Sequence, residues 1–385
     1  MQFFDLKSRL VADLLNDQLP QLLFHFMKKL ILLFFPLFLV HSSFAQTFIK
    51  PNDAGLTYSG RINLNADSAS LYWPGTSVQV NFKGTGLSAV LKSTREDAYY
   101  DVIVDDSVVN KIKIAAGEPQ RSFTLVSGLS QVEHHVQLFK LTNNTSENQF
   151  YGFELAKNAT LLKASKLPKR KIEFYGNSIT AGHGVDVPDG QRDSGEPIYF
   201  NNYYTYAALT ARHFDAQYSC VARSGVGVMV SWFPEIMPEI YNRTNPSDSL
   251  SQWDFSKYTP DIVVVNLFQN DSWIVNLPNH EQFKRRFGTQ KPSDEFIIEA
   301  YKNFIATIRI KYPNAHIICA LGNMDATKEG SKWPNYIKEG IARLNDAKMY
   351  PLFFPYKNSG GHPKREDQKA MANQLCEFIA KNISW

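Results

Sequence analysis

The sequence has few cysteines and no recognisable metal or nucleotide motif. Its three cysteines, Cys220, Cys319 and Cys376, each lie in an apolar stretch of the 385-residue chain. An odd, sparse set does not make a disulfide framework, so we expect three buried thiols that pack as small hydrophobic side chains. The HExxH and paired CxxC motifs that ligate metals are missing, as are the P-loop and the dinucleotide-binding glycine motif. We therefore expect no metal ion and no other cofactor.

A surplus of one charge and a membrane-length apolar run are also absent. The 41 basic and 37 acidic residues give a net charge of +4, and lysine and arginine form no stripe along the chain. This distribution argues against nucleic acid as a partner. The apolar run at residues 30–40 is shorter than the roughly 20 residues that cross a bilayer, so we expect no stable membrane span. We expect a monomer.

The N-terminal region, residues 1–45, has the features of a targeting segment. Lys28 and Lys29 precede the apolar run, and a small-x-small cleavage pattern ends it at residues 43–45. These features predict a signal peptide at residues 27–45 and a secreted or periplasmic mature protein. Residues 1–26 fit neither a targeting signal nor a domain, and our hypothesis is that translation begins at Met27.

Residues 46–165 are predicted to form an all-β domain. Short stretches such as SVQVNFKG and YYDVIVDD alternate apolar and polar residues, and glycines or the Asn143-Asn144 pair separate them. Period-two alternation over six or more short segments predicts a β-sandwich that resembles a jelly roll. His134 and His135 lie in one of these strands, where alternation sends them to opposite faces and makes a poor metal-chelating pair.

Residues 166–385 are predicted to form an α/β domain after a short basic linker, KLPKRK. Buried strands are indicated by KIEFY, AQYSCVA, DIVVVNLF, AHIICALG and YPLFFPY, with amphipathic helices between them. The longest helix follows Ser293, a suitable N-cap, and the last covers about residues 364–381. This alternation predicts a doubly wound, flavodoxin-like parallel sheet with helices on both faces. Active sites in such sheets lie at the carboxyl ends of the strands.

Distinctive residues follow four of the predicted strands at this edge. Ser178 comes after the first strand in EFYGNSITAGHG, Gly225 after the second, Asn270 after the third and His362 after the last. Each alone is ordinary turn chemistry, but four at successive edges of one sheet predict a common site. A nucleophilic serine needs a base such as imidazole, and backbone N–H groups with an asparagine amide can stabilise an oxyanion. The pattern therefore indicates acyl transfer.

These motifs resemble those of the SGNH, or GDSL-type, hydrolases, and the order of β-sandwich and esterase domain is similar to carbohydrate esterase family 2. The resemblance covers nearly all of the chain after residue 45. It implies a secreted enzyme whose partner is an acetylated polysaccharide or oligosaccharide, such as xylan or mannan, from which it removes acetyl groups. It also implies that Ser178 is the nucleophile, that His362 is the base, and that the Ser178 amide, Gly225 and Asn270 form the oxyanion hole.

The chain departs from the family pattern at three positions. Asn177 stands where the first block usually has aspartate, and Phe268 stands where the third block usually has glycine. Ser359 occupies the place of the acid that most of these enzymes have three residues before the histidine. Family 2 is known for a Ser-His dyad in which a backbone carbonyl orients the imidazole, so we expect a carbonyl near Ser359 or Gly360 to do so here. Asp367 is the rival, although it lies inside the last predicted helix.

Substrate contacts are expected from Asp271 and Trp273, which follow the oxyanion asparagine. A tryptophan face packs well against a pyranose, and a carboxylate accepts hydrogen bonds from sugar hydroxyls. The competing interpretation places Trp273 in the core and Asp271 at a turn. Trp232 is a weaker candidate for substrate binding, and His183 is expected to be a rim or turn residue.

Two other functions stay open at this stage. The protein could be a catalytically inactive glycan-binding module, an alternative supported by the three departures. It could also act on another acetyl ester, such as those of sialic acid or peptidoglycan, or on a lipid ester, although the sequence has no long apolar lid. Formation of an acyl-serine at Ser178 would separate an esterase from the inactive module.

Overall fold

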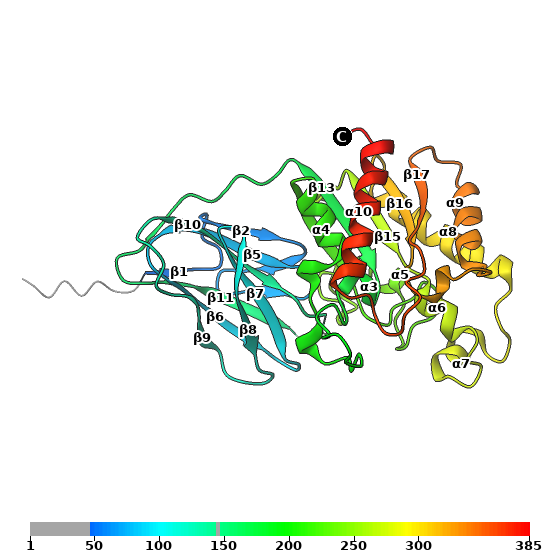
Figure 1. Ribbon diagram of the computed structural model, residues 1–385, viewed down its shortest axis with the longest axis horizontal. Coiled ribbons are helices and arrows are strands. Elements are labelled where there is room, and N and C mark those ends of the chain that lie inside the picture. The colour runs from blue at the N-terminus through cyan, green and yellow to red at the C-terminus, as the bar shows by residue number, and fades with distance from the viewer. Residues whose placement is uncertain (1–46, 144–146) are drawn as a thin grey trace, which may run out of the picture. The chain divides into compact units, whose positions relative to one another are not determined.

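Three sheets organise the computed structural model, which describes residues 47–143 and 147–385 (Figure 1). Two antiparallel six-stranded sheets come first, and a parallel five-stranded sheet follows. The predicted signal peptide lies outside the described residues. Within the described ranges, no helix is both long and apolar enough to cross a membrane.

The first two sheets form a β-sandwich. One has the strand order β3-β4-β11-β6-β9 with β1 paired to β11, and the other has β12-β5-β10-β7-β8 with β2 paired to β5. Inward side chains of both sheets, such as Val80, Leu91 and Phe150, share one hydrophobic core. The all-β prediction is confirmed, because the alternation in the sequence is the alternation between this core and solvent. The strands are β1 (Phe48–Ile49), β2 (Leu56–Ser59), β3 (Ile62–Leu64), β4 (Ala69–Leu71), β5 (Ser77–Lys83), β6 (Leu87–Ser93), β7 (Ala98–Val104), β8 (Ser107–Ile114), β9 (Arg121–Val126), β10 (Glu133–Lys140), β11 (Asn148–Leu155) and β12 (Thr160–Leu161).

The third sheet has the order β14-β13-β15-β16-β17, with all neighbours parallel. Counted along the chain this is 2-1-3-4-5, the flavodoxin-like order that the sequence predicts. In β15, Ile262 and Val264 pack into one helical layer and Val263 and Val265 into the other, which explains why the run is apolar throughout. The predicted boundary between the two domains, at residues 165 and 166, stays a prediction. The strands are β13 (Arg170–Gly176), β14 (Ala216–Ala222), β15 (Ile262–Asn266), β16 (His316–Leu321) and β17 (Met349–Phe353).

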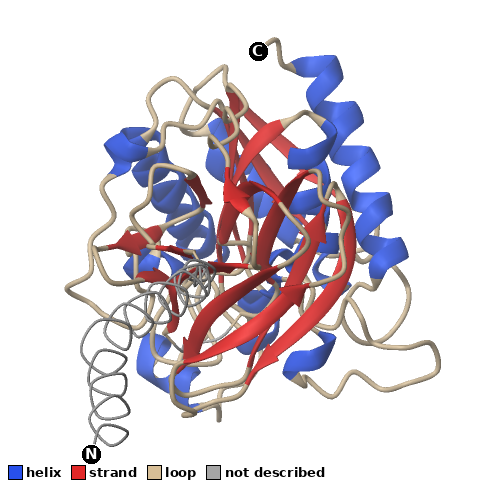
Figure 2. Cartoon of the chain, turned by 90° about the vertical axis from the view of Figure 1, so that its left-hand side faces the viewer, coloured by secondary structure: helices blue, strands red, loops and turns tan. Residues whose placement is uncertain are grey.

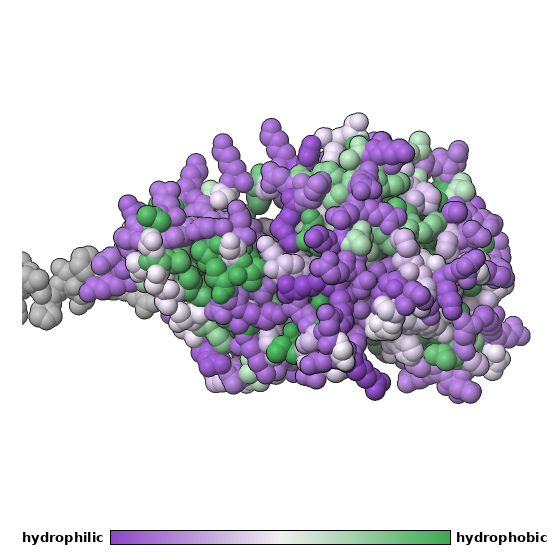
Figure 3. All heavy atoms as spheres, viewed as in Figure 1, coloured by the Kyte–Doolittle hydropathy of each residue, from purple (hydrophilic) through white to green (hydrophobic). Residues whose placement is uncertain are grey.

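Helices cover both faces of the parallel sheet (Figures 1 and 2). Side chains of α4 and α10 pack on one face and those of α8 and α9 on the other. Ser293 caps α8 by accepting the Phe296 N–H at 3.2 Å, as predicted. The three cysteines are buried and free. The face of the molecule seen in Figure 3 is mainly hydrophilic. The helices are α3 (Ser178–Ala181), α4 (Tyr206–His213), α5 (Met237–Ile240), α6 (Gln269–Ile274), α7 (Glu281–Phe287), α8 (Asp294–Lys311), α9 (Trp333–Ala342) and α10 (Arg365–Asn382), with short 3₁₀ turns at Pro197–Tyr199, Asn202–Tyr204, Phe255–Lys257 and Asp325–Thr327.

A buried ion pair joins the sandwich to the parallel sheet. Arg61 lies between β2 and β3, and its guanidinium donates to Glu173 on β13 at 3.1 Å and to the Tyr175 hydroxyl at 2.8 Å. The Tyr312 hydroxyl donates to the same carboxylate at 2.6 Å. Both side chains of the ion pair are fully buried, so each depends on the other for compensation of its charge.

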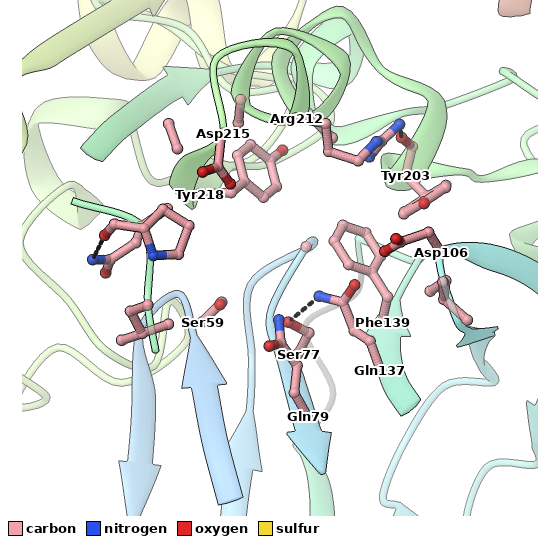
Figure 4. A pocket seen from close by; sticks show the side chains of 18 of the residues that line it. Ser59, Ser77, Gln79, Asp106, Gln137, Phe139, Tyr203, Arg212, Asp215 and Tyr218 are labelled. Atoms are coloured by element: carbon pink, nitrogen blue, oxygen red, sulfur yellow. Dashed lines mark hydrogen bonds between the residues drawn. The ribbon is translucent and has the colours of Figure 1, made fainter. Parts of the chain in front are cut away.

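A cavity of about 250 Å³ also lies at this junction (Figure 4). Its lining includes Pro168 and Ala216, which are at the amino ends of β13 and β14, the opposite edge from the predicted catalytic residues. Polar groups of the lining bond within the protein: Gln137 donates to the Ser77 hydroxyl at 2.9 Å, and Arg212 donates to a backbone carbonyl at 2.7 Å. The cavity is therefore a polar crevice between packed layers, remote from the candidate site.

Candidate active site

The first strand end places Ser178 at the start of a short helix. Asn177 is the N-cap of α3 and accepts the Ile179 N–H at 3.1 Å. A Cβ at Gly176 would lie 2.1 Å from the Thr180 hydroxyl oxygen, so the chain can turn here only with glycine. Asparagine caps a helix as well as aspartate does, which explains how Asn177 replaces the usual acid. Ser178 is 4% exposed at this turn.

The second strand end brings further backbone donors beside the first. The carboxyl ends of β13 and β14 pair at Gly176 and Ala222, and Gly225 follows with a φ of +85°. Among the residues that the structure describes, neither the Ser178 N–H nor the Gly225 N–H is assigned an acceptor. Two adjacent strand ends thus present backbone donors, the arrangement that an oxyanion hole requires.

The sandwich also reaches this turn. In the orientation that satisfies both of its groups, the Asn143 amide donates to the Ala222 carbonyl at 3.0 Å and accepts the Ser224 N–H at 2.9 Å. The residue before Gly225 is therefore fixed by a side chain of the N-terminal domain.

The third strand end holds Asn270 in a buried hydrogen-bond network. Its Nδ2 donates to the Val226 carbonyl at 2.8 Å, and its Oδ1 accepts the Trp232 indole N–H at 3.0 Å. Phe268, just before α6, has a φ of +85°, a left-handed conformation that costs a residue with a side chain about 1–2 kcal/mol. Its ring is buried against Tyr301, with ring centroids 4.8 Å apart, which offsets this cost. The glycine that the resemblance implies for this position would adopt this backbone without strain, and Phe268 keeps the same backbone.

Asp271 is buried and leaves no surface for a substrate to contact, which argues against the predicted substrate role. Its carboxylate has no exposed area and accepts backbone N–H groups from Val228 at 3.0 Å, Met229 at 2.7 Å and Val230 at 3.2 Å. Burial raises the pKa of Asp271 to about 6, although these hydrogen bonds favour the ionised form. Asp271 orders the loop after Gly225, a role that depends on the folded loop.

His362 is oriented by Asp193, an acid that no motif in the sequence singles out. Its Nδ1 donates to Asp193 Oδ2 at 2.5 Å, and its backbone N–H reaches the same oxygen at 3.2 Å. Hydrogen bonds from His183 and His362 hold the pKa of Asp193 well below its ordinary value. Burial lowers the pKa of His362, with Asp193 opposing that change. A cavity of about 430 Å³ opens beside the imidazole.

The expected carbonyl partner of His362 is therefore wrong, and so is the rival. The carbonyl oxygens of Ser359 and Gly360 each accept a hydrogen bond from the Lys357 ammonium at 2.9 Å. Asp367 accepts the Lys364 N–H at 3.0 Å and caps α10. The two carbonyls and the Asp367 carboxylate thus bind neighbouring groups of their own segment and not His362.

The loop that carries Asp193 is anchored at Asp186. This carboxylate binds Lys111 of the sandwich at 2.7 Å, Arg365 of α10 at 2.7 Å and the Asn201 amide at 2.8 Å. A Cβ at Gly184 would lie 3.1 Å from both Asp193 and His362, so the loop can pass beside them with glycine. Contacts far apart in sequence thus determine which acid reaches the histidine.

His183 is not simply a rim residue. Its ring stacks on that of His362, with centroids 3.9 Å apart and an interplanar angle of 25°. Its Nε2 lies 3.3 Å from Asp193, and its backbone N–H donates to the Ser178 carbonyl at 3.0 Å. Among the described residues, no hydrogen bond joins the Ser178 hydroxyl to His362. His183 connects the two residues in another way, because its backbone N–H binds the Ser178 carbonyl and its ring stacks on His362.

An aromatic hollow adjoins the third strand end. Trp232, Trp273 and Trp333 line it together with Asp325. The Trp273 indole N–H lies 2.8 Å from each Asp325 carboxylate oxygen, which fixes the ring at the surface. Trp232 is 43% exposed and binds Asn270, so the hollow is connected directly to the candidate oxyanion group.

Three possible metal ligands also meet at the site. His183, Asp193 and His362 each offer one atom within 4.8 Å of the others, the single cluster of this kind in the described parts of the chain. Two imidazoles and a carboxylate suit zinc. However, His362 Nδ1 and Asp193 Oδ2 lie 2.5 Å apart, a hydrogen-bond distance and closer than two ligands of one tetrahedral zinc ion can lie, so the arrangement does not fit zinc and favours acid–base chemistry.

Two family models match the chain in succession. Residues 58–164 match the Carbohydrate esterase 2 N-terminal model, and residues 174–348 match the GDSL-like Lipase/Acylhydrolase family. These ranges correspond to the β-sandwich and to most of the parallel-sheet domain.

Characterised proteins and solved structures are similar over most of the described fold. The chain is 32% identical to a Cellulase/esterase CelE of Acetivibrio thermocellus over 87% of its own length, but it spans only 40% of that protein. It is 26% identical to an Acetylxylan esterase / glucomannan deacetylase of Cellvibrio japonicus, over 88% of this chain and 91% of that protein. A solved family two carbohydrate esterase from Clostridium thermocellum, in complex with cellohexaose, is 33% identical, with a TM-score of 0.75 over 85% of this chain and 98% of that one.

Proposed function

The chain belongs to carbohydrate esterase family 2, and we propose that it removes O-acetyl groups from polysaccharides or oligosaccharides of the xylan or mannan type, with Ser178 as the nucleophile. The observation that carries this proposal is the hydrogen bond from His362 Nδ1 to Asp193. A proton held on Nδ1 leaves Nε2 free to act as a base. The proposed machinery is therefore a Ser-His-Asp triad in place of the expected dyad.

In the proposed reaction, Ser178 Oγ attacks the acetyl carbonyl carbon and its proton passes to His362 Nε2. Asp193 stabilises the imidazolium, and the oxyanion accepts hydrogen bonds from the Ser178 and Gly225 N–H groups and the Asn270 amide. The intermediate expels the sugar hydroxyl, which takes the proton from His362, and leaves an acetyl-serine. Water then attacks this ester with His362 again as base, and acetate leaves.

The aromatic hollow supports a glycan as the substrate. Trp273 and Trp232 offer indole surfaces beside Asn270, and the apolar face of a pyranose packs on such rings. Asp325 fixes the Trp273 ring, so little side-chain freedom remains to be lost on binding. The names of the curated relatives, which include acetylxylan esterase and glucomannan deacetylase, agree with this substrate class.

An inactive glycan-binding module is the competing function, and one experiment separates the two. In the proposed site Asp193 supplies the acid that is missing at Ser359, and Asn177 caps α3, so these two departures are compatible with an active enzyme. An active esterase should hydrolyse 4-nitrophenyl acetate and react with a fluorophosphonate, and Ser178→Ala should lose both activities. Failure of the folded wild type in both assays would leave only the binding function.

The proposed place of action is outside the cytoplasm. A mature N-terminus at Gln46 on the exported protein would agree with the signal peptide predicted at residues 27–45. A native precursor that begins upstream of Met27 would contradict the proposed start of translation.

A further inference from the structure

His183 contacts Ser178, Asp193 and His362 without having a place in the reaction above. Its backbone N–H binds the Ser178 carbonyl, and its ring lies between His362 and Phe200, with centroid distances of 3.9 Å and 4.5 Å. A serine, a histidine and an aspartate already complete a triad. The second imidazole therefore requires its own explanation.

Asp193 faces the two imidazoles with separate oxygens. Oδ2 binds His362 Nδ1 at 2.5 Å, and Oδ1 lies 3.3 Å from His183 Nε2. The other ring nitrogen, His183 Nδ1, is buried and has no partner among the described residues. A proton there would be a buried donor without an acceptor, which is costly. A proton on Nε2, facing Asp193, thus suits the site better than a proton on Nδ1.

Resting on the proposed function, we propose that His183 is a positioning residue: its Nε2–H shares the Asp193 carboxylate with His362 and moderates the base. A carboxylate that accepts a second donor attracts the His362 proton less strongly. Burial lowers the pKa of His362 and the hydrogen bond to Asp193 raises it, so a weaker hold of Asp193 on the ring leaves the pKa lower. The base is then deprotonated, and ready for Ser178, at a lower pH than Asp193 alone would allow.

Other charged groups around His362 do not replace this effect. Lys357 lies on the same loop and also lowers the pKa of His362. Arg192 and Lys364 line the cavity beside the ring, and Asp193 is the acid in that lining. The Asp193 carboxylate is therefore the group through which His183 acts.

Two substitutions separate the donor from the ring. His183→Phe keeps a stacked ring but loses the N–H, whereas His183→Gln loses the ring but keeps an amide donor. The pH dependence of kcat/KM with 4-nitrophenyl acetate is measured for both, with the exposed His213→Phe as a matched control. We expect His183→Phe to move the acid limb to higher pH and lower kcat about tenfold with little change in KM, and His183→Gln to restore the wild-type limb. The inference would be overturned if the acid limb of the pH profile were unchanged in both variants. It would also be overturned if His183→Gln moved the limb and His183→Phe did not.

An NMR titration tests the same inference without activity. The His362 ring is titrated in Ser178→Ala and in Ser178→Ala with His183→Phe, and the pKa should be higher in the second protein. If wild type neither labels with fluorophosphonate nor hydrolyses the ester, the proposed function fails, yet this titration still decides the role of His183. Should His183→Phe not fold, His183→Asn replaces it, because its shorter amide does not reach Asp193 and the same shift is expected. Equal pKa values in the paired proteins would contradict the proposal.

Discussion

Nδ1 of His362 donates a 2.5 Å hydrogen bond to Oδ2 of Asp193, which lies 169 residues earlier in the chain. The His362 backbone N–H binds the same oxygen, so one carboxylate fixes both the ring and the main chain. Asp193 is in turn held by a loop that Asp186 ties to the sandwich and to α10. The N-terminal domain thus contributes to the placement of the proposed catalytic acid.

Asp193→Asn should lower kcat by roughly 10³- to 10⁴-fold with 4-nitrophenyl acetate. An amide that donates to Nδ1 favours the tautomer with the proton on Nε2, which cannot accept the Ser178 proton. Steady-state kinetics and the rate of fluorophosphonate labelling should fall together.

Ser359→Ala and Asp367→Asn are the matched controls for this change. Ser359 has its carbonyl on Lys357, and asparagine can replace Asp367 as the cap of α10, so both variants should stay within about twofold of wild type. If Asp193→Asn were active and Asp367→Asn inactive, Asp367 of α10 would be the catalytic acid and Asp193 would not.

Regular structure and the strand-end residues could be predicted because their causes are local. Period two marks the sandwich strands, and a run such as residues 262–265 must be apolar when both faces of its strand are covered. Parallel strands end at one edge, which is enough to bring Ser178, Gly225, Asn270 and His362 into neighbouring loops.

The partner of His362 and the role of Asp271 could not be predicted in this way. The loop after His183 contains several acids, and the one that reaches His362 depends on where Lys111 and Arg365 hold Asp186. Asp271 follows Asn270 directly, but its environment is made by backbone N–H groups more than 40 positions earlier, at residues 228–230. The left-handed backbone at Phe268 could have been predicted, because the resemblance implies a glycine at this position and glycine favours that conformation.

Asn270→Ala should lower kcat by about 10²- to 10³-fold, because the oxyanion loses a donor while Trp273 and Asp325 of the aromatic hollow are unchanged. Trp232→Phe should have a smaller effect of the same sign, since it removes only the indole N–H that holds Asn270 Oδ1. Both are measured as kcat and KM with an acetylated xylo-oligosaccharide. A loss confined to KM in Asn270→Ala would place this residue in substrate binding and not in the oxyanion hole.

Arg61→Met should reduce the free energy of unfolding by about 3–5 kcal/mol, because it leaves the Glu173 carboxylate buried without its positive partner. The double variant with Glu173→Gln should recover part of this loss. Lys332→Met is the control, since its ion pair with Asp294 is exposed and should be worth less than about 1 kcal/mol. Urea unfolding provides the comparison, and equal losses for the buried and exposed pairs would contradict the argument.

Asp271→Asn should change how stability depends on pH. Burial raises the pKa of Asp271 to about 6, against roughly 3.9 in an unfolded chain. Between these values the folded protein holds a proton that the unfolded chain has released, so this group makes the free energy of unfolding fall as pH rises. A difference of about two pKa units lowers the free energy of unfolding of the wild type by about 3 kcal/mol as pH rises, and Asp271→Asn does not show this loss. Urea unfolding at about pH 4 and about pH 7 should therefore show the wild type losing more stability than Asp271→Asn across this interval, and parallel curves would mean that Asp271 does not titrate there.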